Sequence, residues 1–266
     1  MKIGKYEVAG NAAIMGILNV TPDSFSDGGA YTQIEAALSQ VAEMIEAGAS
    51  IIDIGGESTR PGASFVSAEE EIERVVPVIK AIRERFDVLI SIDTYKTETA
   101  RAALEAGAHI LNDVWAGLYD GQMLALAAEY QAPIILMHNQ EEEIYHKITD
   151  DVCTFLTERA QVALDAGVSK ENIWIDPGFG FAKTEAQNIE LLKGLEQVCQ
   201  LGYPVLFGIS RKRTVDYLLG GQTKASERDM GTAALSAHAI SKGCQIVRVH
   251  NVLANRDIVK VASQLV

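Results

Sequence analysis

The chain repeats one pattern along its whole length: a short apolar run suited to a fully buried parallel strand, then a segment with helical periodicity. Strict alternation of strand and helix, with right-handed crossovers, fits either a doubly wound open sheet or a closed barrel. Eight repeats within 266 residues favour the barrel, because a (β/α)8 TIM barrel needs about 250 residues. We therefore predict a single α/β domain of this kind over residues 1–266, with strands near 13–18, 50–54, 88–92, 109–111, 133–137, 172–175, 204–209 and 245–249.

Helix boundary signals occupy the segments between the strands. Ser67 with Glu70, and Thr32 with Glu35, fit the capping box that opens a helix. Several helices are expected to end at a glycine that supplies a left-handed C-cap: Gly48, Gly107, Gly167 and Gly243.

A polar residue closes nearly every predicted strand, where a buried strand would otherwise be apolar. One such Asp or Asn alone is explained as a cap on the following turn. In a barrel, however, the strand ends converge on one rim, which is where these enzymes keep their catalytic groups. We therefore expect the active site at the C-terminal ends of the strands, among Asn19, Asp53, Asp93, Asn112 with Asp113, His138, Asp176, Ser210 and His250.

The charge balance excludes some partners. The chain has 36 acidic and 23 basic residues, a formal net charge of -13, and no basic run that would attract nucleic acid or an anionic membrane. No apolar stretch approaches the ~18 residues of a membrane span, and the first ten residues lack the apolar core of a signal peptide, so we expect a cytoplasmic protein. Cys153, Cys199 and Cys244 form no CxxC pair and are expected to be buried thiols.

Cationic residues gather at the predicted rim of this acidic chain. They are Arg60, Lys212, Arg248 and His250. Such a set predicts a local site for an anion such as phosphate. Arg60 belongs to the loop GGESTRPG, which adds backbone N–H groups and hydroxyls, and Lys212 stands at a predicted helix start, whose free N–H groups add anion affinity. The loops over 20–31 and 55–67 are long for a barrel, which also indicates function.

Asp93, Asn112 and Asp176 form a second set, able to accept and to donate hydrogen bonds. Two carboxylates and an amide suit a ring rich in N–H donors, such as an aminopyrimidinone, better than a sugar. Met137 and Phe181 are placed to line the same pocket. The sequence therefore predicts an anion site and a site for a flat polar ring at one rim.

Two other interpretations of the rim stay open. Asp93, His138, Asp176 and His250 offer metal-ligand atoms, although no HxH or HExxH spacing supports a metal site. Lys212 is the only rim lysine for a Schiff base, yet between two arginines it is better suited to an anion or a carbonyl oxygen. Trp174, inside a predicted strand, is expected to pack on the outside of the barrel.

Longer motifs resemble those of the dihydropteroate synthase family. They are ILNVTPDSFSDGG from Ile17, IDIGGESTRPG from Ile52, SIDT from Ser91, LND from Leu111, LMH from Leu136, DPGFGFAKT from Asp176, SRKR from Ser210 and GTAALSAHAISKGCQIVRVHNV from Gly231. The resemblance covers essentially the whole chain. It implies a transferase that condenses 6-hydroxymethyl-7,8-dihydropterin diphosphate with p-aminobenzoate, giving 7,8-dihydropteroate and diphosphate in folate biosynthesis.

The resemblance also implies roles for individual residues. The pterin would be held by Asp93, Asn112, Met137, Asp176, Phe181 and Lys212. The diphosphate would be held by Thr59, Arg60, Arg248 and His250, and Asn19 would ligate Mg2+ bound to it. The p-aminobenzoate side would be formed by Phe25, Thr59, Pro61, Lys212 and Arg213. Of these residues, the catalytic ones would be Asp93, Lys212 and Arg248.

The implied chemistry is an SN1-like path, because the pterin ring delocalises positive charge from the exocyclic CH2 as the C–O bond breaks. The amine then attacks without a strong base. The two long loops are expected to order only after diphosphate is in place, positioning the amine and excluding water. Small molecules are thus the expected partners, together with a second copy of the chain in a homodimer.

The chain departs from the family pattern at a few positions. Asn251 stands where members usually have Asp, and Arg213 where many have Ser, which leaves the contacts of the aminobenzoate carboxylate less defined. An acidic segment, EEEIY over 141–145, follows LMHNQ.

Two rival functions share parts of this pattern. A pterin-binding methyltransferase acting on a methylated folate with a corrinoid partner would share the barrel and the acidic pterin contacts, but it has less use for Arg60, Arg248 and His250. A noncatalytic pterin-binding protein would not need Asn19 as a metal ligand.

Overall fold

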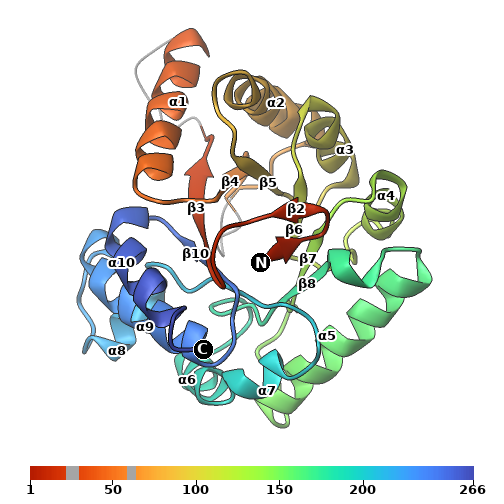
Figure 1. Ribbon diagram of the computed structural model, residues 1–266. Coiled ribbons are helices and arrows are strands. Elements are labelled where there is room, and N and C mark those ends of the chain that lie inside the picture. The colour runs from red at the N-terminus through yellow and green to blue at the C-terminus, as the bar shows by residue number, and fades with distance from the viewer. Residues whose placement is uncertain (22–29, 59–63) are drawn as a thin grey trace.

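A closed barrel of parallel strands forms the centre of the molecule (Figure 1). The computed structural model describes residues 1–21, 30–58 and 64–266. The sheet order is β8-β7-β6-β5-β4-β3-β10-β9, and a bridge between Ile175 and Val205 joins its two edges. A doubly wound sheet would instead reverse its strand order. The predicted TIM barrel is confirmed, with strands β3 (Ala13–Asn19), β4 (Ile51–Gly55), β5 (Leu89–Asp93), β6 (Ile110–Asp113), β7 (Ile134–Met137), β8 (Ile173–Asp176), β9 (Leu206–Phe207) and β10 (Ile246–Val249).

Helices surround this barrel on its outer side (Figure 1). In the described part of the chain they are α1 (Ala30–Glu46), α2 (Ala68–Arg85), α3 (Thr97–Ala106), α4 (Met123–Tyr130), α5 (Ile148–Asp165), α6 (Glu185–Lys193), α7 (Leu195–Cys199), α8 (Arg213–Leu218), α9 (Asp229–Ser241) and α10 (Val252–Ala262). None of these helices is long and apolar enough to cross a membrane.

The capping signals are confirmed in part. Ser67 precedes α2, and its side chain accepts from Glu70 N at 3.2 Å. Gly107 ends α3 with a φ of 112°, the left-handed conformation that glycine adopts without strain. The second expected capping box was wrong, because α1 begins at Ala30 and Thr32 lies inside its first turn.

Strand β9 is shorter than the predicted run of 204–209. Pro204 has no N–H to donate to a neighbouring strand. At the other end, the Ile209 carbonyl accepts from Lys212 N at 3.1 Å, which turns the chain away from the sheet. Only Leu206 and Phe207 therefore keep the strand pairing with β10.

Alternate residues of each strand face opposite sides of the barrel wall. Outward-facing residues, such as Ile52 and Ile54, belong to the large core beneath the helices. Inward-facing residues form a second core, closed by the hairpin of β1 (Lys2–Ile3) and β2 (Tyr6–Glu7), which lies over the barrel in Figure 1. Its buried members are Ile3, Val8, Ala13, Met15, Ile51, Ile110, Ile135, Trp174, Leu206 and Ile246. The expected outer packing of Trp174 was wrong, since this indole lies inside the barrel.

A second inward-facing layer follows nearer the C-terminal ends of the strands, and it is largely polar. Its members stand two residues after an apolar interior residue, in the pairs Ile51 and Asp53, Ile110 and Asn112, Ile135 and Met137, Trp174 and Asp176, and Ile246 and Arg248. The period of two along a strand thus brings these side chains to one layer. Asp113 is one residue out of phase, and its carboxylate instead accepts from Trp115 N at 2.8 Å and Gly117 N at 2.6 Å in the following turn.

Candidate active site

Arg248 lies between two carboxylates in this polar layer. Its Nε donates to Asp53 Oδ2 and its Nη2 to Asp93 Oδ2, each at 2.6 Å. Burial lowers the pKa of Arg248, but the two carboxylates outweigh burial and leave it above its ordinary value. Asn112 Nδ2 donates to Asp53 Oδ2 at 3.2 Å. Asp53 therefore orients both the guanidinium and the amide.

Asp93 keeps one oxygen available for a ligand. Its Oδ1 is buried and has no hydrogen-bond partner among the described residues. Burial raises the pKa of Asp93, and the charge of Arg248 opposes this effect. Because a buried acceptor without a donor is costly, this oxygen marks a place where a ligand N–H is expected.

Asp176 and Lys212 supply opposite charges to the same layer. Asp176 Oδ1 accepts from Gly178 N at 2.7 Å. Lys212 Nζ donates to Phe179 O at 2.6 Å and lies 4.5 Å from the centre of the Phe181 ring. Burial raises the pKa of Asp176 against the opposing charge of Lys212, and burial lowers the pKa of Lys212 to about 8 with Asp176 opposing. A carboxylate, an ammonium and an aromatic ring thus meet at this wall.

Small and apolar groups leave room beside Asp176. Met137 is its partner in the strand register and is buried. A Cβ on Gly208 would lie 3.4 Å from Asp176 Oδ2, so a larger residue there would narrow the space at this oxygen.

Ser210 and His250 form the last polar pair of the rim. Ser210 Oγ accepts from His250 N at 3.1 Å and lies 3.0 Å from His250 Nδ1. The Ser210 hydroxyl is able to donate to Nδ1 in the tautomer that carries its proton on Nε2. His250 lies two residues after Arg248, so two of the four predicted diphosphate ligands come from one strand and its end.

The alternative metal site, built on Asp93, His138, Asp176 and His250, is not supported. Among residues 1–21, 30–58 and 64–266, no group of three or more His, Cys, Asp and Glu side chains is arranged to hold a metal ion. His138 Nδ1 lies 2.9 Å from Lys183 Nζ instead. Burial and the charge of Lys183 lower the pKa of His138 to about 3, so its ring is a neutral acceptor.

Several predicted site residues lie outside the described part of the chain. They are Phe25, Thr59, Arg60 and Pro61. Asn19 is described, and it is the exposed last residue of β3 on the same side of the strand as Met15. Its amide therefore stands at the C-terminal rim.

Comparison with known proteins extends this geometry. A family model described as pterin binding enzyme matches residues 15–250. A dihydropteroate synthase of Streptococcus pyogenes serotype M6 is 77% identical over 265 residues, covering 100% of both chains. The chain belongs to the dihydropteroate synthase family.

Solved structures of family members share the fold. The crystal structure of a dihydropteroate synthase from Clostridium difficile in the presence of pteroic acid has a TM-score of 0.93 and 42% identity, covering 100% of this chain and 98% of that one. The Xanthomonas albilineans dihydropteroate synthase in complex with 7,8-dihydropteroate has a TM-score of 0.87 and 41% identity, covering 96% and 94%. These relatives are dihydropteroate synthases, so the chain is a transferase of this type and the methyltransferase alternative is not favoured.

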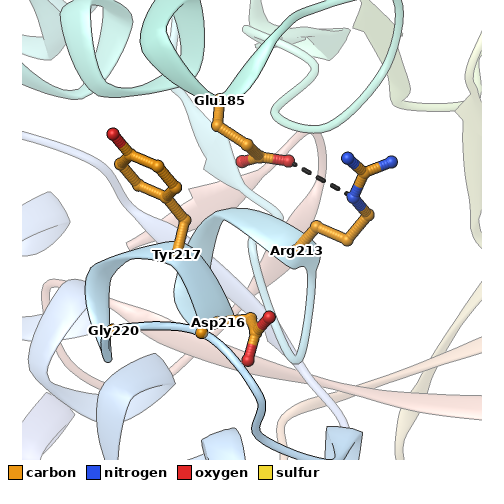
Figure 2. Close-up of a pocket in the computed structure, with 6 residues that line it drawn as sticks. Glu185, Arg213, Asp216, Tyr217 and Gly220 are labelled. Carbon is orange, nitrogen blue, oxygen red and sulfur yellow. Dashed lines mark ion pairs between the residues drawn. The ribbon is translucent and has the colours of Figure 1, made fainter.

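Arg213 is a predicted site residue whose described contact lies away from the polar layer. Its side chain is 88% exposed, and its Nε lies 3.6 Å from Glu185 Oε1. Figure 2 shows both residues at a pocket of about 440 Å³, lined by Glu185, Arg213, Asp216, Tyr217, Gly220 and Gly221. None of the other predicted site residues in the described part of the chain lines this pocket.

The family departure at Asn251 has a local explanation. Its Oδ1 accepts from Ala254 N at 3.0 Å and caps α10, while its Nδ2 donates to Asp229 Oδ2 at 2.8 Å. Asp229 also pairs with Arg211 at 2.6 Å. An aspartate at 251 would keep the cap but face the Asp229 carboxylate with a second negative charge, so asparagine suits this neighbour.

Asp53 and Lys183 make contacts that were not predicted from the sequence. Asp53 was recognised as a polar strand end but was given no role, although the period of two from Ile51 places it inside the barrel beside Arg248. Lys183 belongs to the motif DPGFGFAKT, and no neighbouring residue in the sequence indicates that its ammonium is buried.

Proposed function

We propose that this chain, as a dihydropteroate synthase, joins p-aminobenzoate to 6-hydroxymethyl-7,8-dihydropterin diphosphate through the polar layer inside its barrel. The main support for this site is Asp93 Oδ1, which is buried and has no hydrogen-bond partner among the described residues. It belongs to the same layer as the Asp176 carboxylate and the Lys212 ammonium. An aminopyrimidinone ring presents N–H donors to carboxylates and a carbonyl oxygen to an ammonium. The products are 7,8-dihydropteroate and diphosphate, in folate biosynthesis.

In this proposal each predicted residue keeps its role. The pterin contacts are Asp93, Asn112, Met137, Asp176, Phe181 and Lys212. The diphosphate contacts are Thr59, Arg60, Arg248 and His250, and the aminobenzoate side consists of Phe25, Thr59, Pro61, Lys212 and Arg213. The pairing of Arg248 with Asp53 and Asp93 supports a guanidinium held in place before the substrate arrives, which lowers the cost of ordering it on binding.

Bond cleavage precedes attack in the proposed reaction. The C–O bond to diphosphate breaks, the electron pair leaves with diphosphate, and the ring shares the positive charge of the exocyclic CH2. The amine of p-aminobenzoate then forms the C–N bond and loses a proton. Substituents that change the basicity of the amine are therefore expected to alter kcat very little, and a steep dependence of kcat on amine basicity would argue for direct displacement.

Mg2+ fits the exposed end of β3. An amide oxygen is a suitable ligand for Mg2+, which keeps several waters and takes its remaining ligands from phosphate oxygens. Asn19 would hold the ion at the rim, where it would neutralise charge on the departing diphosphate.

We further propose that the protein works in the cytoplasm as a homodimer. Exposed apolar side chains on α8, α9 and α10 support an interface there: Tyr217, Leu218, Met230 and Leu253 are 60%, 49%, 70% and 60% exposed. Sedimentation at several concentrations tests the dimer.

The two long loops are proposed to order after diphosphate binds, so the affinity for p-aminobenzoate should rise when diphosphate is present.

The first experiment measures diphosphate release from the pterin diphosphate with Mg2+, with and without p-aminobenzoate, and identifies the product by mass. Release that depends on the amine and yields dihydropteroate supports the proposal. Binding of the pterin diphosphate without release would instead support a noncatalytic pterin-binding protein.

A further inference from the structure

Lys183 is a buried lysine with an unusual set of partners. It is 5% exposed, yet no carboxylate of the described residues contacts its ammonium. Its Nζ instead lies 2.9 Å from His138 Nδ1 and donates to Gly178 O at 2.9 Å and Phe181 O at 3.1 Å. These contacts use all three N–H groups of an ammonium. A buried cation is costly, so its retention at this position calls for a function.

The Lys183 acceptors belong mainly to a loop that has no regular secondary structure. Gly178, Gly180 and Ala182 have φ values of 71°, 76° and 43°, so the loop over 177–182 passes through the left-handed region three times. Side chains from outside the loop hold it in place. Lys183 binds the carbonyls near both of its ends, and Tyr145 Oη donates to Ala182 O at 2.8 Å.

The same loop supplies contacts to the proposed pterin site. Gly178 N donates to Asp176 Oδ1, the Phe179 carbonyl accepts from Lys212 Nζ, and the Phe181 ring lies beside the same ammonium. Lys183 is thus linked to Asp176 through Gly178, whose carbonyl it binds and whose N–H contacts Asp176, and to Lys212 through Phe181, whose carbonyl it binds and whose ring lies beside the Lys212 ammonium. A change in its hydrogen bonds would shift the carbonyl and the ring that fix Lys212.

We propose that Lys183 is a positioning residue for the pterin half of the substrate: through the Gly178 and Phe181 carbonyls it holds the loop over 177–182 in the conformation that orients Asp176 and Lys212. The inference rests on the proposed function, because it assigns these two residues to the pterin. Lys183 itself does not need to contact the substrate in this role. Its loss should therefore weaken pterin binding more than p-aminobenzoate binding, because Asp176 and Lys212 both belong to the pterin site and only Lys212 also belongs to the aminobenzoate side.

The charged and titratable groups around Lys183 define the conditions of the test. They are His138 directly after β7, Asp176 on β8, Lys212 at the start of α8 and Tyr145 in the loop after β7. Burial lowers the pKa of Lys183 to about 7, while Asp176 acts in the opposite direction. The ammonium form that donates three hydrogen bonds predominates below that pKa, so the measurements belong at about pH 6.

The test compares Lys183→Met with Tyr145→Phe and with the control Lys193→Met, which removes an exposed lysine at the end of α6. The dissociation constant of the pterin diphosphate is titrated without p-aminobenzoate, and both KM values and kcat are then measured. We expect Lys183→Met to weaken pterin binding by about tenfold or more, Tyr145→Phe by a smaller factor, and Lys193→Met not at all. The KM for p-aminobenzoate should rise by a smaller factor than the pterin dissociation constant in Lys183→Met and stay within about twofold in the other two variants.

Two results would overturn the proposal. One is unchanged pterin affinity in folded Lys183→Met; the other is an equal rise of both KM values, which indicates a general structural role. If Lys183→Met does not fold, Tyr145→Phe decides the matter, because it removes one hydrogen bond from the same loop without changing shape or charge. Wild-type protein that binds the pterin diphosphate without turnover would refute the proposed function alone, since the titration still tests Lys183.

Discussion

Arg248 and Asp176 contribute opposite charges to one layer, and their removal should have different consequences. Arg248→Ala leaves Asp53 and Asp93 buried without their cation, which costs about 3 kcal/mol or more of folding free energy, and it also removes a diphosphate ligand. Asp176→Asn keeps the shape of the side chain and the cation, so we expect it to weaken pterin recognition and to retain diphosphate binding. Calorimetric titration of both variants with diphosphate measures this; equal losses would contradict the division of roles.

Lys212 should give the reaction a dependence on pH. Burial lowers its pKa to about 8, so the ammonium is present below that pH and is lost as the pH rises through it. The ratio kcat/KM for the pterin diphosphate reports groups of the free enzyme. Because burial also lowers the pKa of Lys183 to about 7, we expect this ratio to fall in two steps as the pH rises through about 7 and about 8, whereas Lys212→Met should be low throughout and lack the step near 8. A wild-type profile that is flat across this pH would show that the ammonium is not needed.

The loop after β8 depends on a glycine for steric reasons. A Cβ on Gly178 would lie 2.0 Å from His138 O, whereas nothing lies within 4 Å of a Cβ on Gly202, which has a similar φ of 82°. Both substitutions by alanine place a side chain in the left-handed region, at about 1 kcal/mol. We expect Gly202→Ala to cost only that, and Gly178→Ala to cost more and to raise the KM for the pterin diphosphate. Chemical denaturation compares the stabilities of the two variants, and steady-state kinetics compares their KM values for the pterin diphosphate. Similar losses of stability and affinity in both variants would mean that the loop tolerates the displacement.

The elements that the sequence predicts well are those with a local cause. Buried parallel strands need continuous apolar runs, so each of the eight predicted runs overlaps a strand of the barrel. Errors arose where apolar character alone does not decide. The short β9 depends on the turn bond between Lys212 N and Ile209 O, and the interior place of Trp174 depends on which face of β8 turns inward. That second error was avoidable, since Trp174 stands two residues before Asp176.

The polar rim was predictable as a position but not as a network. Strand ends of a barrel must converge, which is enough to bring Asp93, Asn112 and Asp176 to one rim. The pairing of Arg248 with Asp53 joins residues 195 apart in the chain, and the three contacts of Lys183 need a folded loop. Such contacts leave no periodic signal. The family resemblance supplied the roles of residues in the two long loops, and those at 25 and 59–61 lie outside the described residues.

Across the whole molecule, the anion site has to act against the overall charge. The chain carries a formal net charge of -13, so a diphosphate is repelled at a distance and held only where local cations and backbone donors face it. Binding to the folded state alone then stabilises the protein by about 2.7 kcal/mol at 100 times the dissociation constant. For a chain of this size, that is a rise in Tm of about 5 to 10 °C.

We therefore expect diphosphate with Mg2+ to raise the Tm of the wild type by that amount, measured by calorimetry. Arg248→Ala should lose most of the rise, because its guanidinium belongs to the proposed diphosphate site. Arg256→Ala is the matched control: it removes the same charge from an exposed side chain on α10 that pairs only with its neighbour Asp257 in the described contacts. If Arg256→Ala lost as much of the rise as Arg248→Ala, the effect would reflect net charge, and the proposed site at the barrel rim would be wrong.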